Sequence, residues 1–266
     1  MITIISAWYN EEFLAPLFLE HYSFADRIII MLDESTNDGT IDEIKKFMAR
    51  DSFISFRKLH MPDGLDDKLK QRQMNEQYRQ IEKGWVIEVD SDEFIKIPEI
   101  GMKPFLSEIK EDVVLVMFWQ MYQNSQVEKP LDNVTPVFEQ RQHGIRNRFR
   151  RWNKPCVVRA GRNYAWGVGH HDIVPPRNIS SKLLFGAHWS MADTDMAIAR
   201  RIYGHKNRQS KANYQNRLSV HNHKVTEEEI INKCDSYKNC PPVVWAKTLG
   251  EKEDNYYKLM AKKGLI

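Results

Sequence analysis

The first third of the chain alternates between short apolar runs and amphipathic stretches, and this alternation limits the possible folds more than any other feature. Residues 2–7, 27–32, 53–59 and 85–89 are rich in β-branched and other apolar residues, which predicts four buried strands. The stretches between them carry apolar residues at helical spacing, and the last, 66–84, is predicted to end at Gly84 as a C-cap. Strands that alternate with helices are joined by right-handed crossovers and form parallel sheets. We therefore predict a Rossmann-like α/β fold with a mostly parallel central sheet flanked by helices.

The rest of the chain has a less regular pattern, with short apolar pieces and several prolines between residues 124 and 181. Apolar runs predict further strands over 113–122 and 181–190. Later helices are predicted over 193–208, with the apolar stripe Ile198, Ala199, Ile202 and Tyr203, over 226–237, with the capping box Thr226 and Glu229, and over 253–266. These patterns predict one domain with an irregular second lobe and C-terminal helices.

The composition is typical of a globular protein. Hydrophobic residues make up 42% of the chain and aromatic residues 11%, enough to form a core and to exclude a disordered chain. A formal net charge of +3 is small for 266 residues and argues against nucleic acid as the partner. Three cysteines without metal-like spacing indicate a reduced, cytoplasmic protein. No apolar run approaches the ~20 residues that cross a bilayer, and we recognise no signal peptide, so any membrane contact is expected to be peripheral, at the inner face.

Three carboxylates stand almost side by side where the fourth predicted strand ends, in the sequence WVIEVDSDEFI over residues 85–95. Carboxylates repel one another, so their clustering is unfavourable unless a cation or hydrogen bonds compensate. Residues two apart in an extended segment point the same way, which lets Asp90 and Asp92 face one ion. Mg²⁺ and Mn²⁺ take such oxygen ligands. An acidic turn or a solvated helix N-cap is the alternative interpretation.

The acidic segment is predicted to lie where a ligand binds. In parallel α/β sheets, ligands bind outside the carboxyl ends of the strands. Tyr9 and Asn10 follow the first predicted strand, and Asp33 follows the second. These side chains are therefore expected to share one edge of the sheet with the acids.

Four segments occur in the order and spacing of family 2 glycosyltransferases with the GT-A fold, which the chain resembles. They are ISAWYNEEFLAPLFLEHY, IIIMLDESTNDGT, KLKQRQMN and GWVIEVDSDEFI. The likeness is to the subgroup with an early N-E, a D-S-x-D-G-T segment and D-x-D-E-F, and it covers residues 2–97. A looser likeness continues through residues 154–172 and 188–205.

The resemblance implies an enzyme that moves a sugar, with inversion, from a nucleotide-diphosphate sugar to a hydroxyl of a glycan or lipid-linked acceptor, in cell-surface glycan or polysaccharide synthesis. It also implies that residues 1–266 form a single glycosyltransferase domain. Within it, residues 1–120 would form the nucleotide-sugar-binding half, 121–195 the acceptor half and 196–266 a C-terminal helical extension.

The resemblance assigns the donor site as well. Arg72 and Asn75 match the family's Arg-x-x-Asn on the helix before the metal strand, and Asp33 would contact the base or ribose. Asp92 would bind Mn²⁺ or Mg²⁺, with Asp90 between the metal and the ribose. The full set implied for the nucleotide sugar is Ala7, Tyr9, Asn10, Asp33, Lys68, Arg72, Asn75, Asp90 and Ser91. A solvated helix face is the alternative for Lys68 and Arg72, and a turn residue for Asp33.

Two further roles fall in the later half of the chain. His188 follows an apolar run, and GT-A enzymes often supply a late histidine as a metal ligand; a core or turn histidine is the alternative. Inverting transfer needs a general base on the acceptor hydroxyl. Asp172, in the glycine-flanked GVGHHD, is the first candidate, with Glu139 and Asp193 behind it. A histidine-rich surface turn is the alternative for this loop.

A basic run, RQHGIRNRFRRW over residues 141–152, is the other candidate binding segment. Alternation would put Arg146, Arg148 and Arg150 on one face of a strand, where an anionic acceptor, a lipid head group or nucleic acid could bind. A solvated basic strand and turn is the alternative.

Two other functions stay open. A nucleotidyltransferase would normally carry a glycine-rich basic loop after the first strand, and SAWYNEE has none. A catalytically inactive carbohydrate- or RNA-binding module is the alternative outside the enzymes.

Overall fold

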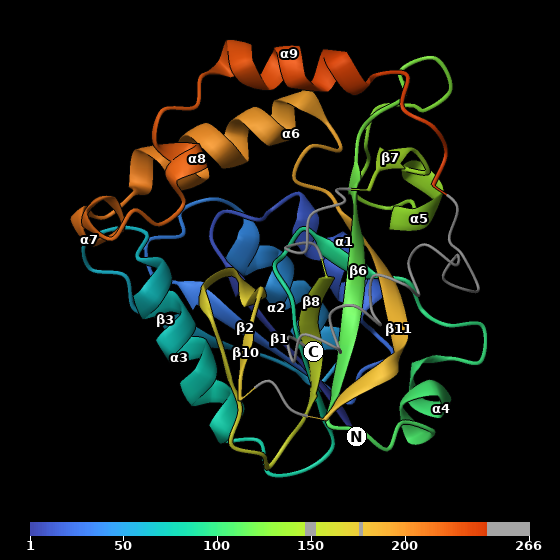
Figure 1. Cartoon of the computed structure of the whole chain (residues 1–266). Coiled ribbons are helices and arrows are strands. Elements are labelled where there is room, and N and C mark those ends of the chain that lie inside the picture. The colour runs from blue at the N-terminus through green and yellow to red at the C-terminus, as the bar shows by residue number, and fades with distance from the viewer. Residues whose placement is uncertain (147–152, 176–177, 244–266) are drawn as a thin grey trace.

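A computed structural model describes residues 1–146, 153–175 and 178–243 of the chain. Its centre is one large sheet (Figure 1). In chain order, the strands of this sheet are β1 (Ile2–Trp8), β2 (Arg27–Asp33), β3 (Ile54–Leu59), β4 (Trp85–Glu88), β5 (Glu93–Ile95), β6 (Val113–Met121), β7 (Gly144–Ile145), β8 (Asn153–Arg159) and β11 (Ile179–His188). Their spatial order is β3-β2-β1-β4-β8-β6-β11-β5, and β7 pairs with β6. β9 (Ala165–Trp166) and β10 (Ile173–Val174) form a small separate sheet.

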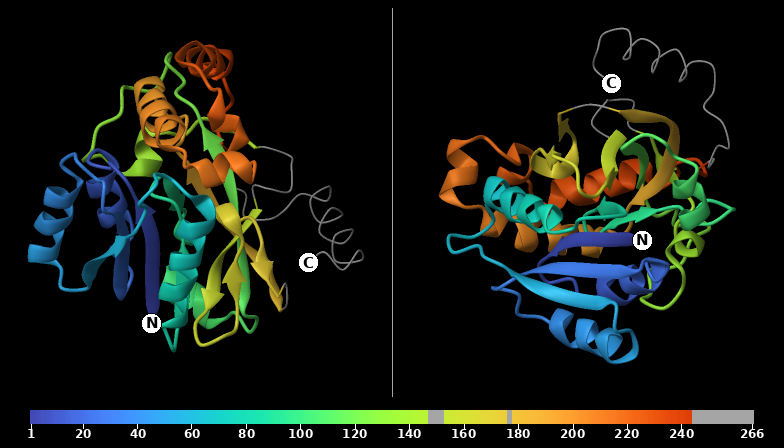
Figure 2. Two further views of the ribbon diagram at one scale, coloured as in Figure 1. Left: turned by 90° about the vertical axis from the view of Figure 1, so that its left-hand side faces the viewer. Right: turned by 90° about the horizontal axis from the view of Figure 1, so that it is seen from below.

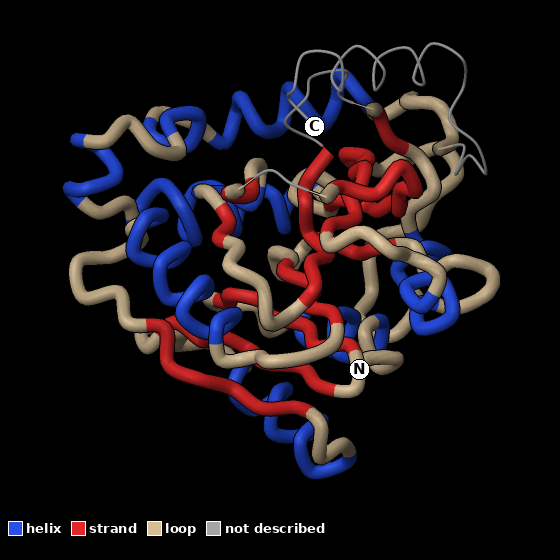
Figure 3. The backbone as a smooth tube through the Cα atoms, turned by 60° about the horizontal axis from the view of Figure 1, so that its bottom comes forward, coloured by secondary structure: helices blue, strands red, loops and turns tan. Residues whose placement is uncertain are grey.

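Helices surround the sheet, as the tube view shows (Figure 3). The α-helices are α1 (Leu14–His21), α2 (Thr40–Arg50), α3 (Asp67–Arg79), α4 (Met102–Ser107), α5 (Val137–Gln140), α6 (Thr194–Ile198), α7 (Lys211–Gln215), α8 (Val220–His223) and α9 (Glu227–Tyr237). The described residues also form the 3₁₀-helices η2 (Val168–His170) and η4 (Lys206–Arg208) and the π-helix η3 (Ala199–His205). Within the described residues, no helix combines the length and the apolarity that spanning a membrane requires.

The amino-terminal half confirms the predicted α/β architecture. β1 pairs in parallel with both β2 and β4, and β2 pairs in parallel with β3. Alternate residues of β1 face opposite sides, so Ile4 packs in the core beside α1 and α2, whereas Ile5 packs in the core beside α3. The helices on the two faces are visible from below the sheet (Figure 2). The four predicted strands are all present, and their carboxyl ends share one edge.

The other half of the sheet is mixed. β8 runs antiparallel to β4 and β6, β5 runs antiparallel to β11, and β6 and β11 are parallel. In the β5–β11 pair, Glu93 lies opposite His188. This pairing brings the end of the acidic segment against a strand that is remote in the sequence.

α6, α8 and α9 lie across the carboxyl edge of the sheet (Figure 1). The predicted helix over 193–208 is divided into α6, η3 and η4, and the predicted capping box of Thr226 and Glu229 starts α9. The predicted apolar stripe is wrong at Ala199, which is exposed, and at Tyr203, which is 59% exposed, because the wider π-helical turn changes the phase of the buried face. The helix predicted over 253–266 lies outside the described residues.

The predicted end of the third helix is also wrong. α3 stops at Arg79, and Gly84 lies just before β4 with a φ of +93°. A Cβ at Gly84 would collide with the carbonyl oxygen of Met1, so glycine is required here for a close approach of two backbones and not for a helix cap.

Candidate functional site

The acidic segment between β4 and β5 lies against two lysines. Asp90 keeps 27% of its side chain exposed, and its carboxylate lies 3.5 Å from the ammonium groups of both Lys70 and Lys154. Burial would raise the pKa of Asp90, but these two charges outweigh it and hold the pKa well below its usual value. Asp90 is therefore ionised throughout the physiological range.

Lys154 links Asp90 to a fully buried carboxylate. Its Nζ lies 2.5 Å from Oε1 of Glu93, and the other carboxylate oxygen of Glu93 accepts a hydrogen bond from the backbone N–H of Asp90. Burial lowers the pKa of Lys154, but the charges of Glu93 and Asp90 raise it further, with a net upward shift. A lysine from β8 thus neutralises two acids that are neighbours in sequence.

Asp92 faces a different set of partners. Its Oδ2 lies 3.2 Å from a guanidinium nitrogen of Arg200 and 3.5 Å from Nε2 of His188. Its carbonyl accepts a hydrogen bond from the backbone N–H of Trp189. Burial opposes ionisation of Asp92, but Arg200 and His188 hold its pKa well below the usual value. The predicted pair of Asp92 and His188 is therefore brought together.

Glu11 is part of the same cluster, and its side chain is buried beside Arg200 and Ser91. It forms an ion pair with Arg200 and accepts a hydrogen bond of 2.7 Å from the hydroxyl of Ser91. One guanidinium thus faces two carboxylates, those of Glu11 and Asp92. Burial raises the pKa of Glu11 to about 7, although Arg200 and Ser91 act in the opposite direction. Glu11 is the carboxyl of this pair that takes up a proton first.

The raised pKa of Glu11 predicts a pH dependence of stability. Its folded pKa of about 7 lies above the ordinary 4.5, so the folded state binds more protons between these values. The favourable contribution is complete below pH 4.5 and is lost as the pH rises to about 7. At about 1.4 kcal/mol per pKa unit, the loss is about 3 kcal/mol. Glu11→Gln should remove it.

The measurement is urea denaturation of wild type and Glu11→Gln at intervals from pH 4.5 to 8. The difference between the two proteins isolates Glu11 from buried histidines such as His21, whose pKa burial lowers to about 4 and whose contribution has the opposite sign. A difference that stays constant across this range would contradict the role assigned to Glu11.

One group of side chains has the spacing of a metal site. Single ligand atoms of Asp90, Glu93 and His170 all lie within 4.8 Å of one another. Nε2 of the buried His170 lies 2.7 Å from Oε1 of Glu88, but off the hydrogen-bond direction, and neither ring nitrogen has a hydrogen-bond partner among the described residues. Two carboxylates and an imidazole with unused nitrogens suit Mn²⁺ or Mg²⁺, so the residues fit a divalent cation.

The predicted nucleoside contacts lie at the ends of β1 and β2. Asp33 is buried, and its Oδ1 accepts a hydrogen bond of 2.9 Å from the backbone N–H of Ser35. The Tyr9 ring lies under the guanidinium of Arg208, which also contacts Asp33. Tyr9 and Asp33 are therefore brought together, as predicted, with an arginine between their functional groups.

The two other predicted residues of β1 and its loop have more local contacts. Ala7 is half-buried beside the core that packs on α3. The side-chain amide of Asn10 exchanges two hydrogen bonds with Asn37, at 2.8 and 2.9 Å. Asn10 thus positions the loop between β2 and α2.

The predicted residues on α3 are spread around the helix. Lys68 donates a hydrogen bond to Asn216, and Arg72 is exposed. Both side-chain ends of Asn75 bond to the backbone of Trp166, which ties α3 to β9. α3 presents Lys70 to Asp90 instead, and Gln71 to Glu88.

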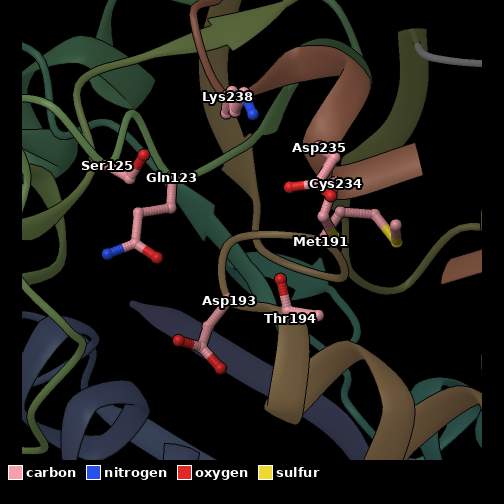
Figure 4. Close-up of a pocket in the computed structure, with 8 residues that line it drawn as sticks. All are labelled: Gln123, Ser125, Met191, Asp193, Thr194, Cys234, Asp235 and Lys238. Carbon is pink, nitrogen blue, oxygen red and sulfur yellow. The ribbon is translucent and has the colours of Figure 1, made fainter. Parts of the chain in front are cut away.

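The three candidates for the general base lie in separate places. Asp172 is exposed, and its carbonyl accepts a hydrogen bond from Gly167. Glu139 is exposed on α5. Asp193 caps α6 and borders a cavity of about 70 Å³ just beyond the ends of β6 and β11 (Figure 4). The cavity is lined by Gln123, Ser125, Met191, Asp193, Thr194, Cys234, Asp235 and Lys238.

The basic run is described only in part. Arg141 is buried, and its guanidinium donates to the carbonyls of Ala192 and Lys129, so it is a structural residue. The remainder of the run from residue 147 to 152, and with it the predicted alternation of arginines, lies outside the described residues.

Sequence reasoning missed five titratable groups that the structure gathers at this edge: Glu11, Lys70, Lys154, Arg200 and His205. Burial, with the charges of Arg200 and Lys70, lowers the pKa of His205 to about 3 and keeps its ring neutral. Glu11 stands in the early N-E motif and could have been found there. The others come from segments whose local patterns show only helix or strand.

The fold is an α/β fold, and a cluster of charged side chains lies at the carboxyl edge of its sheet. No protein-family description matches the chain, and no curated protein sequence matches it significantly. Among solved structures, TarS from S. aureus is 13% identical, with a TM-score of 0.45 over 89% of this chain and 43% of that chain. The present chain thus spans less than half the length of that protein.

Two further likenesses are of the same kind. TarS residues 1–349 in complex with UDP-GlcNAc are 14% identical, with a TM-score of 0.43 over 81% of this chain and 69% of that chain. A mannosyltransferase from Pyrobaculum calidifontis, in complex with GDP-Man and Mn²⁺, is 16% identical, with a TM-score of 0.33 over 45% and 35% of the two chains. At these TM-scores the likenesses do not support an inference about function. The function must be inferred from the residues of this chain.

Proposed function

We propose that this protein is a metal-dependent glycosyltransferase that moves a sugar from a nucleotide-diphosphate donor to a hydroxyl of a glycan or lipid-linked acceptor, with inversion. The observation that carries the proposal is the placement of Asp90 and Asp92 just after the buried strand β4, with His170 near Asp90 and His188 near Asp92. The Tyr9–Asp33 pocket lies at the same edge. The sequence motifs that resemble family 2 glycosyltransferases contribute these same residues.

A bound ion and the basic side chains of the protein would both contribute positive charge to the reaction. When bound, a divalent cation would neutralise charge on the diphosphate, held by Asp90 with either Asp92 and His188 or Glu93 and His170. The chain itself adds fixed positive charge at this edge, from Lys70, Lys154 and Arg200. Such preorganised charge stabilises a leaving nucleotide diphosphate without reorganisation.

The test is a panel of nucleotide sugars, screened by thermal shift with Mn²⁺ or with EDTA. We expect one or more donors to raise the unfolding temperature, and to do so more strongly with Mn²⁺, because a bound ion would offset the repulsion between the acids and the phosphates. Donor hydrolysis is then measured for each hit. Binding of a donor without any hydrolysis of it, and without any transfer to acceptor glycans, would indicate a binding module instead of an enzyme.

The general base gives a second prediction. We propose Asp172 for this role, and its exposure leaves the carboxylate accessible to an acceptor. Asp172→Asn should lower turnover by about 10²- to 10⁴-fold, because the amide cannot take the proton of the hydroxyl. Donor affinity and the Mn²⁺ requirement should not change, and calorimetry with the donor checks this.

The matched comparisons are Asp193→Asn and Glu139→Gln, which remove the same charge elsewhere. If Asp172→Asn turned over at a near-normal rate while one of these was slow, the base would move to that residue. Asp193→Asn also weakens a helix cap, so its thermal unfolding is measured in parallel.

A further inference from the structure

The guanidinium of Arg208 occupies the space between Tyr9 and Asp33, and this space is called the Tyr9–Asp33 pocket. The guanidinium carbon lies 3.2 Å from the centroid of the Tyr9 ring. One guanidinium nitrogen lies 2.5 Å from Oδ2 of Asp33 and 3.1 Å from the hydroxyl of Ser35. The side chain of Arg208 is only 12% exposed, and that of Asp33 is 3% exposed. Arg208 is therefore seated in the pocket and not resting on the surface.

The guanidinium makes the two contacts in this pocket that a nucleobase could make, stacking on Tyr9 and donating to Asp33. It is planar, it stacks on an aromatic face, and its N–H groups donate to a carboxylate. A base that stacked on Tyr9 and donated to Asp33 would use the same ring face and the same carboxylate. Because carbon atoms in contact lie about 3.5–4.0 Å apart, no ring can enter between Arg208 and Tyr9. The two occupants therefore exclude each other.

Backbone hydrogen bonds hold the segment that carries Arg208 in place. The carbonyl of Arg208 accepts a hydrogen bond of 2.6 Å from the N–H of Leu65, and the N–H of Ser210 donates to the carbonyl of Leu65 at 3.0 Å. These bonds hold the segment beside the loop that precedes α3. An arginine side chain has several rotatable bonds, so the guanidinium can leave the pocket while the backbone stays in place.

We propose that Arg208 is a built-in occupant of the nucleoside subsite, which the nucleoside of the donor must displace. This inference depends on the proposed function, because it takes the Tyr9–Asp33 pocket as the site of the donor nucleoside. The observed dissociation constant equals the intrinsic one divided by the fraction of molecules in which the pocket is open. Arg208 therefore selects ligands that offer Asp33 an N–H donor in exchange for its own.

The test is calorimetry with uridine and guanosine, and then with UDP and GDP, on wild type and Arg208→Ala. The binding of nucleosides decides the question. Removing the positive charge of Arg208 weakens the binding of the phosphates in UDP and GDP for a separate reason. We expect Arg208→Ala to bind the nucleoside about tenfold more tightly, which is the gain when an occupant present in nine molecules of ten is removed. Arg208→Gln, which keeps a polar side chain of similar reach, should give a smaller gain.

Arg79→Ala is the matched control, since it removes an exposed arginine from the far end of α3 and should leave nucleoside affinity unchanged. Thermal unfolding establishes that each variant is folded. If Arg208→Ala does not fold, nucleoside affinity is compared between wild type and Arg208→Gln. Unchanged nucleoside affinity in the variant would overturn the inference, and so would weaker affinity, which would make Arg208 a contact for the base. If neither wild type nor variant bound any nucleoside or nucleoside diphosphate, the proposed function would fail as well.

Discussion

Replacement of Asp92 by alanine is expected to lower turnover of the nucleotide-sugar donor by at least ~10²- to 10³-fold, the size of effect found when one preorganised electrostatic contact is removed from an active site. Asp92 is buried at the end of β4, with His188 and Arg200 against its carboxylate. If Asp92 and His188 hold the ion, loss of Asp92 should abolish the Mn²⁺-dependent part of the affinity for a nucleoside diphosphate. Calorimetry with UDP and GDP, in Mn²⁺ and in EDTA, measures this directly.

Asp42→Ala provides the control, because it removes an exposed carboxylate from α2. The two histidines then show which ligand set holds the ion. If the set is Asp92 with His188, His188→Ala should raise the Mn²⁺ concentration needed for half-maximal rate, and His170→Ala should not. The reverse result would assign the ion to Glu93 and His170. Equal nucleotide affinity with and without metal, in wild type and Asp92→Ala alike, would exclude a metal-bridged donor.

Arg200→Ala should cause the largest loss of stability, about 3–5 kcal/mol, because removing one partner of a buried ionic cluster leaves its other charges uncompensated. Arg200 faces both Glu11 and Asp92, and it also donates to the hydroxyl of Ser91 at 3.3 Å. Glu11 can relieve part of this by taking up a proton, so the loss should be smaller at pH 5 than at pH 8. Urea denaturation at both pH values measures it.

Arg79→Ala, an exposed arginine of the same charge, should change stability by no more than about 0.5 kcal/mol. Arg200→Lys should recover only part of the loss, since one ammonium group lacks the fork that contacts two carboxylates. A loss below about 1 kcal/mol for Arg200→Ala would mean that the acids at this edge are compensated without it.

The order of elements in the first half could be predicted because each one has a strong local pattern. β1, β2 and β4 are apolar runs bounded by turns, and parallel pairing puts Tyr9, Asp33 and Asp90 at one edge by geometry alone. The pairing of β5 with β11 could not be predicted in this way. It joins residues nearly a hundred positions apart and depends on packing that no local pattern encodes.

The basic side chains that pair with the acids could not be predicted, for a related reason. Lys154 is near the start of the strand β8 and Arg200 belongs to a helical pattern, so each has the local appearance of a solvated charge. Only the folded chain shows that both are buried against carboxylates. The π-helix adds to the difficulty, because its wider turn breaks the spacing from which the buried face of a helix is predicted.

The acidic segment is held at both ends by the sheet. β4 lies between β1 and β8, β5 pairs with β11, and the carbonyl of Asp92 is bonded to Trp189. Loops in active sites are commonly the least stable parts of a protein, whereas this one can open only if neighbouring strands separate. The backbone that carries the carboxylates is thus held by the sheet, and binding need not order it. We therefore expect the movement that admits a ligand to occur in side chains outside this segment, such as that of Arg208.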